Sequence, residues 1–347
     1  MKLISFFNFL ILVIPLGLKA QVMPVWMDNG RQDIIEFNRE VEAYLSSKEP
    51  GCITYTENPV NIESKYFHEV DEWLKPVFFK SGPKLISLKP AGKKGQNHAL
   101  GDSLYHVRKY QQAREAYLTS IKSNPDNWFS YLYLGDTFFI FDQLDTTRYW
   151  FEASVRKNPR SWKAWKYLGD LYFESGDSVA AIDAAVRSIL LNPYGFESWG
   201  LLGIIGKRYG FSIWNPADST PVVFDSLSRC LVVQRKFEKS KDYRAMTNFI
   251  LMKQDSLQEN KIWEEGYSIF ASTWEKERPD SLADLYKREP FREYLVTLQK
   301  TGNLKLHVSW THLLSRYPEA GMVLPDEDFD TMVDFVKSHF LLYDSEE

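Results

Sequence analysis

The sequence predicts an all-α fold in which helical hairpins stack side by side into a curved solenoid. Two markers predict it, and each recurs every 34 residues along the chain. The first marker is a Leu-Gly pair, at Leu100-Gly101, Leu134-Gly135, Leu168-Gly169 and Leu202-Gly203. The second is a proline with the same step, at Pro125, Pro159 and Pro193. A unit of this length holds two amphipathic helices that cannot cover their own apolar faces, so neighbouring units must stack.

The first 20 residues have the build of a secretory signal peptide. Lys2 gives a positive start, Leu3–Leu18 is almost wholly apolar, and the small residue Ala20 stands just before Gln21. An uncleaved membrane anchor is the alternative, but the apolar stretch is shorter than the ~20 residues that cross a bilayer, and Pro15 interrupts it. We therefore expect cleavage after Ala20 and export to the periplasm or out of the cell. This cut resembles that of exported proteins of Bacteroidetes-type bacteria.

Composition and charge exclude several classes of protein. With 44% hydrophobic and 15% aromatic residues, the chain is not disordered. Its 42 basic and 46 acidic side chains give a net charge of −4, which becomes −6 when Lys2 and Lys19 leave with the signal peptide. Proteins that bind nucleic acid usually carry a positive excess, so we expect no such partner. No later stretch is long and apolar enough for a membrane span in the mature chain.

The mature chain divides into an N-terminal mainly helical segment at 21–93, a repeat array at 94–213 and a C-terminal mainly helical region at 214–347. In the N-terminal segment, residues 51–56 favour a short strand. Amphipathic helices are expected on either side of it, from the spacing of Ile34, Ile35, Phe37, Val41 and Tyr44, and of Phe67, Val70, Trp73 and Leu74.

The array consists of units at 94–127, 128–161 and 162–195 and a partial unit at 196–213. These units resemble the tetratricopeptide repeat family in the aromatic before each Leu-Gly pair, the bulky residue after it, the second-helix aromatic and the closing proline. The residues are Tyr131, Trp165 and Trp199; Leu104, Phe138 and Tyr172; and Tyr117 and Phe151. Asn97, Thr147 and Ala185 depart from the pattern. The resemblance implies a right-handed superhelix whose first helices line a concave face.

The recurring glycine has its own physical meaning. Glycine inside a helix costs about 1 kcal/mol relative to alanine. Its recurrence therefore predicts a position where a second helix comes too close to admit a Cβ atom.

Beyond the array, residues 222–224 and 230–233 favour a small β-hairpin, and a helix is nearly as plausible. Two amphipathic helices follow, one with Trp263, Tyr267, Phe270 and Trp274 on one face and one with Phe329, Val333, Val336 and Phe340. Pro325, followed by three acidic residues, is a favourable start for the last helix. We expect these helices to continue and cap the solenoid.

The two cysteines, Cys52 and Cys230, flank the array. Export would place them in a compartment where they can pair. The alternative is two separate buried thiols that behave as small hydrophobic groups.

Known catalytic and metal-binding motifs are absent from the sequence. It contains no Cys-x-x-Cys, no phosphate-binding glycine loop and no Gly-x-Ser-x-Gly. His307 and His312 are five residues apart, which does not place both on one helix face, and the acidic run at Asp326 lacks the glycine of a calcium loop. We therefore predict no catalytic residue, no metal site and no cofactor. The alternative is a hydrolase-like enzyme whose two carboxylates meet in the C-terminal region, with the repeats as a recognition arm.

The resemblance further implies that the concave face binds another protein or peptide. The expected partner-binding residues are Phe129, Leu132, Asp136, Phe139, Ile140, Lys163, Lys166, Asp170 and Phe173. The apolar members suggest a patch that needs cover, so we expect a partner helix or extended peptide anchored by Phe129, Leu132 and Phe139. Lys163 and Lys166 would then pair with acidic groups of that partner. The alternative is that the protein's own N-terminal segment or C-terminal helix fills the groove.

These expectations together describe an exported scaffold or adaptor, active in envelope assembly or in a secreted complex. The sequence leaves its oligomeric state open.

Overall fold

The computed structural model of the protein describes residues 52–56, 77–81, 84–88, 95–216, 222–225, 230–235, 240–252, 260–277, 290–314 and 324–343. The expected signal peptide and the helices expected around residues 34–44 and 67–74 lie outside these residues. Among the described residues, no helix combines the length and the apolar character needed to cross a membrane.

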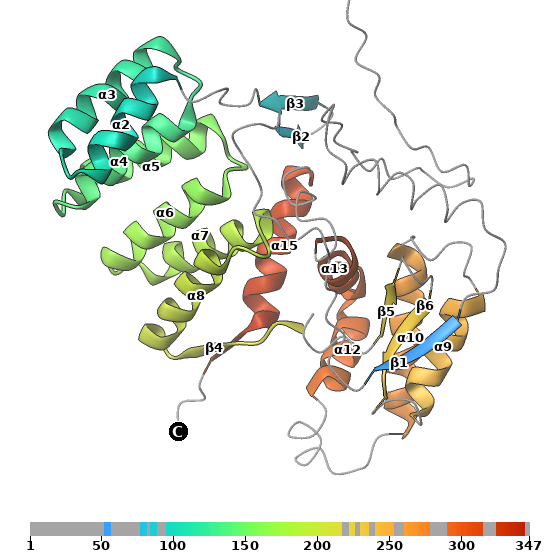
Figure 1. Ribbon diagram of the computed structural model, residues 1–347. Helices are drawn as coiled ribbons and strands as arrows, with labels where there is room; N and C mark the ends of the chain where they lie inside the picture. Colours follow the sequence, from blue (N-terminus) through green and yellow to red (C-terminus); the bar gives the residue numbers. More distant parts are fainter. Residues whose placement is uncertain are drawn as a thin grey trace, which may run out of the picture.

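Seven consecutive helices form the repeat array (Figure 1). They are α2 (Gln96–His106), α3 (Tyr110–Ser123), α4 (Trp128–Phe139), α5 (Leu144–Lys157), α6 (Trp162–Glu174), α7 (Ser178–Leu191) and α8 (Phe196–Tyr209). The hairpins α2–α3, α4–α5 and α6–α7 coincide with the three predicted complete units, and α8 is the first helix of the partial unit. The predicted helical-hairpin fold is thereby confirmed.

The first of the two 34-residue markers, the Leu-Gly pair, works by close packing between the two helices of a unit. A Cβ atom added to Gly101 would lie 2.5 Å from the ring of Tyr117, and one added to Gly135 would lie 2.6 Å from the ring of Phe151. Such distances are well below van der Waals contact, so only glycine fits where the second-helix aromatic crosses the first helix. The predicted close approach is confirmed in these units.

The second marker, the proline, is linked to the aromatic residue that opens the next unit. Nε1 of Trp165 donates to the carbonyl oxygen of Pro159 at 2.9 Å, and Nε1 of Trp199 donates to that of Pro193 at 2.7 Å. The hydroxyl of Tyr131 donates in the same way to Pro125 at 3.1 Å. Proline stops the second helix from continuing, and the aromatic side chain then donates to the proline carbonyl in the turn that follows.

Buried serines join the two helices within a unit. Oγ of Ser154 donates to the carbonyl of Trp128 at 2.9 Å, and Oγ of Ser188 donates to that of Trp162 at 2.8 Å. Each serine lies near the end of a second helix and reaches the start of its own first helix, so it closes the hairpin from inside. Because these side chains are fully buried, the hydrogen bonds also remove the cost of burying a hydroxyl group.

Short strands form three small sheets outside the array. β5 (Val222–Asp225) and β6 (Cys230–Gln234) pair as an antiparallel hairpin, which confirms the predicted hairpin, and β1 (Cys52–Thr56) adds to β6 in parallel orientation. The strand expected at 51–56 is thus present. The hairpin of β2 (Val77–Ser81) with β3 (Lys84–Leu88), and the pairing of β4 (Phe211–Ile213) with β7 (Leu341–Tyr343), are additional to the prediction.

The C-terminal region is helical and shares one hydrophobic core with the end of the array. Its elements are α9 (Lys241–Met252), α10 (Asn260–Glu277), α12 (Pro290–Thr301), α13 (Leu304–Val308), the π-helix η4 (Ser309–Leu314) and α15 (Asp326–Phe340). Trp162, Leu202, Trp263, Leu295 and Phe340 all belong to this core. The two amphipathic helices expected here are confirmed as α10 and α15, with Tyr267, Phe270, Val333 and Val336 buried.

The last helix lies on the outer side of the array. α15 packs against α7, the second helix of the third unit, and the turn before it contacts the loop between α5 and α6 (Figure 1). It therefore does not add a further hairpin to the stack, and it does not occupy the face formed by the first helices.

Candidate functional site

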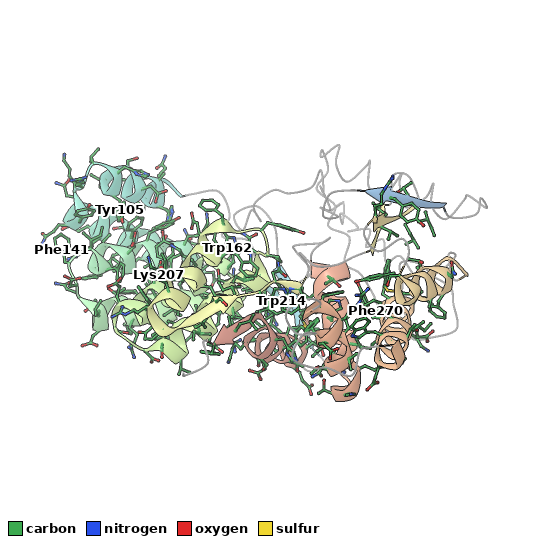
Figure 2. All side chains as sticks on the ribbon, turned by 90° about the horizontal axis from the view of Figure 1, so that it is seen from below. Tyr105, Phe141, Trp162, Lys207, Trp214 and Phe270 are labelled. Carbon is green, nitrogen blue, oxygen red and sulfur yellow. The ribbon has the colours of Figure 1, made fainter. Side chains whose placement is uncertain are left out.

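The first helices of the units form one continuous face. α2 contacts α4, α4 contacts α6, and α6 contacts α8, while each second helix packs between first helices. Helices that touch at every step lie on the inner side of a curved stack, so α2, α4, α6 and α8 line its concave side. Figure 2 labels Tyr105 on the first of these helices and Lys207 on the last. We call the surface made by Asp102, Tyr105, Tyr133, Asp136, Lys166, Tyr167 and Asp170 the inner face.

One aspartate per unit forms an acidic row along the inner face, each directly after the glycine of the Leu-Gly pair. The first, Asp102, accepts a hydrogen bond from the Tyr117 hydroxyl at 2.9 Å and lies 3.3 Å from Nε2 of His98. The second, Asp136, accepts a hydrogen bond from the Tyr105 hydroxyl of the preceding unit. Asp102 thus ties α2 to its own second helix, and Asp136 ties the second unit to the first.

The third aspartate, Asp170, forms an ion pair within its own helix. Its Oδ2 lies 2.9 Å from Nζ of Lys166, one turn earlier on the same helix. Burial raises the pKa of Asp170, and it raises the pKa of Asp136 as well. Both carboxylates are therefore partly desolvated, and an added cation beside them would favour their ionised form.

Tyrosine rings make the floor between these carboxylates. Tyr133 stacks on Tyr117 with ring centroids 6.2 Å apart and meets Tyr167 edge to face at 6.3 Å. Burial, together with the nearby aspartates, raises the pKa values of Tyr105 and Tyr167, so these phenols stay neutral. The result is an aromatic floor with carboxylates along it. Such a surface can take the ammonium or guanidinium groups of a basic peptide by ion pairing and by cation–π contact.

The predicted apolar patch in the second unit is wrong for two of its anchors. Phe129 is 1% exposed and Leu132 0% exposed, and both belong to a core cluster with Ala164 and Leu168 of the next unit. The buried Phe129 ring stacks on the half-buried ring of Tyr133, with ring centroids 6.4 Å apart, so this position faces the core. Neither side chain can reach a partner while the array is folded.

The remaining predicted residues divide between the inner face and its rim. Asp136, Lys166 and Asp170 lie on the inner face. Phe139 is half-buried against Phe151, and Ile140 is exposed at the end of α4. These positions stay predictions as far as partner binding is concerned.

The expected role of the two lysines does not fit their surroundings. Lys166 pairs with Asp170, and Nζ of Lys163 lies 5.1 Å from the ring centre of Trp162. At the far end, Arg208 lies over the half-buried ring of Phe173 at 4.8 Å and donates to its carbonyl oxygen. These groups are engaged within the chain, and the row of aspartates makes the middle of the inner face acidic. A basic partner therefore fits this surface better than the acidic partner expected from the lysines.

Sequence reasoning missed Tyr133 and Tyr167 as residues of the inner face. A signal was available, because they occupy the same position in consecutive units, directly before the Leu-Gly pair. That position faces the groove and carries a large aromatic in both units. Among the described residues, no group of three histidine, cysteine, aspartate or glutamate side chains is arranged to hold a metal ion.

Comparisons with known proteins agree with the repeat architecture. The family model described as Tetratricopeptide repeat matches residues 98–154 and 148–195. A search of curated proteins finds no match.

Two solved structures are similar to parts of the chain. The first TPR of Spaghetti (RPAP3), bound to the HSP90 peptide SRMEEVD, is 20% identical, with a TM-score of 0.31, and the match covers 32% of this chain and 89% of that one. The MamA protein is 18% identical, with a TM-score of 0.30, and the match covers 64% of this chain and 93% of that one. At these values, neither likeness bears on what this protein binds. The family match and the helical hairpins identify the array between residues 98 and 195 as tetratricopeptide repeats.

Proposed function

We propose that this protein is a scaffold that binds a polypeptide segment on the inner face of its repeats, and that this segment carries lysine or arginine side chains. The observation that carries the proposal is the row Asp102, Asp136 and Asp170, one carboxylate per unit. The Cα rise of an extended peptide is about 3.3 Å per residue, so basic residues spaced along such a peptide can meet successive members of the row. Tyr133 and Tyr167 between the carboxylates would contact the aliphatic stems of those side chains.

The charge balance of the inner face supports a basic partner. Between α2 and α6 the inner face holds three carboxylates and one lysine, and that lysine already pairs with Asp170. Burial has already removed much of the water around Asp136. A lysine or arginine that binds beside it therefore displaces little further water. The desolvation cost is therefore partly met before binding, which favours the charged pair.

The test compares two fluorescent peptides of equal length, one alternating lysine with glycine and one alternating glutamate with glycine. Fluorescence anisotropy measures their binding to the full chain. We expect the lysine peptide to bind and the glutamate peptide not to bind, and we expect added salt to weaken the complex. Equal binding of the two peptides would contradict the proposal.

Variants locate the binding on the inner face. Asp136→Asn with Asp170→Asn removes two charges but keeps acceptors for Tyr105 and Lys166, so the fold should survive. We expect about tenfold weaker binding, which corresponds to about 1.4 kcal/mol. Glu115→Gln on the outer helix α3 together with Glu152→Gln on the outer helix α5 changes the net charge equally and should leave binding unchanged. If both double variants weaken binding alike, the attraction is diffuse and the inner face is not the site.

We further propose that the protein acts after export. The apolar stretch Leu3–Leu18 and the small residue Ala20 support this proposal. Mass spectrometry of the protein recovered from its native compartment should give a chain that begins at Gln21. A chain that keeps Lys2 in the mature protein would argue against cleavage. The alternative of a hydrolase-like site in the C-terminal region stays a prediction, and no observation here favours it.

A further inference from the structure

The array ends on a face of α8 that no helix covers among the described residues. In the complete units, a side chain packs against the glycine of the Leu-Gly pair. Tyr117 packs against Gly101, and Phe151 packs against Gly135. A Cβ atom added to Gly203 on α8 would meet nothing within 4 Å. The reason lies in the chain path, because Gly210 adopts a positive φ of 75° and turns the chain into β4 instead of a second helix.

The uncovered face is strongly apolar for an exposed surface. Phe196 is 81% exposed, whereas Trp128 and Trp162, at the same position of the preceding units, are 1% exposed. Ile204 is 57% exposed and stands where the preceding units carry an aspartate of the acidic row. Together with Gly200 and Gly203, these residues recur at helical spacing on one side of α8. We call Phe196, Gly200, Gly203 and Ile204 the open α8 face.

The open α8 face has the shape of half a helix–helix contact. Gly200, like Gly203, has nothing within 4 Å of an added Cβ atom, so the backbone is open to close approach there. Phe196 and Ile204 stand on either side as large side chains. Close helix packing joins a bulky side chain of one helix to a small residue of the other, and α8 carries both kinds on the same face.

We propose that the open α8 face binds the same face of a second copy of this chain, with the two α8 helices antiparallel. A twofold contact must be self-complementary, because each residue meets a different residue of the identical surface. With the axis at the level of Leu202, Ile204 of each copy faces Gly200 of the other. The same axis brings Glu197 of each copy opposite Lys207 of the other. A single arrangement therefore places a bulky side chain opposite a glycine and an acidic side chain opposite a basic one.

The helix dipoles favour the same orientation. In an antiparallel pair, the positive N-terminal end of one helix lies beside the negative C-terminal end of the other. Glu197 stands in the first turn of α8 and Lys207 in the last, so the side-chain charges follow the dipoles within each copy as well. A single helix pair is a small interface, so we infer a reversible dimer with dissociation in the micromolar range, about −8 kcal/mol.

Sedimentation equilibrium of the full chain, over about 1 to 200 µM, tests the proposal. We expect a monomer at the low end and a dimer at the high end. Gly200→Arg should keep the chain monomeric throughout, because a charged side chain replaces the hollow that receives Ile204. The fold should persist, because the added side chain meets open space and arginine favours helix more than glycine does. Circular dichroism of the variant checks this.

A charge exchange separates a second copy from any other occupant. Glu197→Lys alone and Lys207→Glu alone should each weaken the dimer, because each places like charges opposite one another. The double variant should regain it, because the exchange restores both pairs across the twofold axis. Glu115→Gln on α3 is the control and should leave the dimer unchanged. A monomer at every concentration, a dimer that survives Gly200→Arg, or a double variant weaker than both single variants would each overturn the proposal.

Discussion

Nη2 of Arg160 lies 2.6 Å from Oδ1 of Asp326 and so joins the loop between the second and third units to the first turn of α15. The same nitrogen donates to the carbonyl oxygen of Leu324 at 2.9 Å, and the guanidinium lies over the ring of Phe329 at 4.3 Å. Arg160 is 2% exposed, so it depends on these partners to balance a buried charge. This contact helps to hold the last helix on the outer side of the array, away from the inner face.

Removing the carboxylate from this pair should destabilise the protein measurably. In Asp326→Asn, the buried guanidinium loses its countercharge, and we expect a loss of about 1–3 kcal/mol in the free energy of unfolding. Asp328→Asn is the matched control, because it removes an exposed charge from the same first turn of α15 and so has the same effect on the helix dipole. Urea unfolding measures both variants, and equal losses would show that the ion pair adds nothing beyond the dipole.

Stability should fall with acid because of one buried histidine. His307 is fully buried among Tyr267, Phe291 and Tyr294, and burial lowers its pKa to about 3 from the ordinary 6.5. Below pH 6.5 the unfolded chain takes up a proton that the folded chain refuses. The free energy of unfolding should therefore decrease as pH falls from about 6.5 towards 3, by up to about 1.4 kcal/mol per pH unit from this group.

The variant His307→Gln tests this pH dependence, because glutamine stays neutral and can either donate to the Tyr294 hydroxyl or accept from it. Urea unfolding between pH 4 and 7 should give a shallower slope for this variant than for the unchanged chain, whatever its stability at pH 7. His106→Gln is the control, because it removes an exposed histidine at the end of α2, and it should keep the original slope. An unchanged slope in His307→Gln would assign the acid sensitivity to other groups.

The repeat geometry was predictable from sequence because it depends on contacts that recur. Gly135 lies under Phe151, and Trp165 donates to Pro159, so each 34-residue marker records a contact made again in the next unit. Period alone therefore located the helices and their turns. It could not tell that Phe129 lies inside the stack, because a groove position and a core position on the same helix differ by a small rotation.

The contacts between the array and the C-terminal segments could not be predicted from the sequence, because each occurs once and joins residues that lie far apart in the chain. β4 pairs with β7, and Ser212 is the Cα partner of Leu342. Lys337 on α15 lies 3.0 Å from Asp183 on α7, without any repeated marker to announce the pair. The sequence showed that the repeat pattern stops after α8. It did not show that one face of α8 is exposed, because that depends on where the following chain packs.

The same substitution at two equivalent glycines should have opposite effects on stability. In Gly135→Ala, the added Cβ would lie 2.6 Å from the fully buried ring of Phe151, and such overpacking typically costs about 1–3 kcal/mol. In Gly203→Ala, the added Cβ meets open space, and the better helix propensity should stabilise the chain by about 0.5–1 kcal/mol. Thermal unfolding, at a concentration low enough to keep the chain monomeric, measures both. A loss of stability in Gly203→Ala would mean that α8 is covered in solution.

The register of the sheet around β6 makes a disulfide the expected state of the two cysteines. β1 runs parallel to β6, and Cys52 is the Cα partner of Cys230. Neighbouring strands lie about 4.8 Å apart, which is within the Cα separation of about 4.4–6.8 Å that a disulfide spans. In the test, oxidised glutathione serves as the oxidant. It accepts two electrons and two protons from the two thiols and is converted to two molecules of reduced glutathione.

Peptide mapping by mass spectrometry without reduction should therefore find the two cysteines in one cross-linked peptide pair. The bond would close a loop that contains the whole array, and long loops lose the most chain entropy, so reduction should lower stability by about 5 kcal/mol. Cys52→Ser should show the same loss without any response to reductant, because it lacks the bond from the start. Two thiols that both react with an alkylating reagent after oxidation would show that strand pairing alone holds β1 on β6.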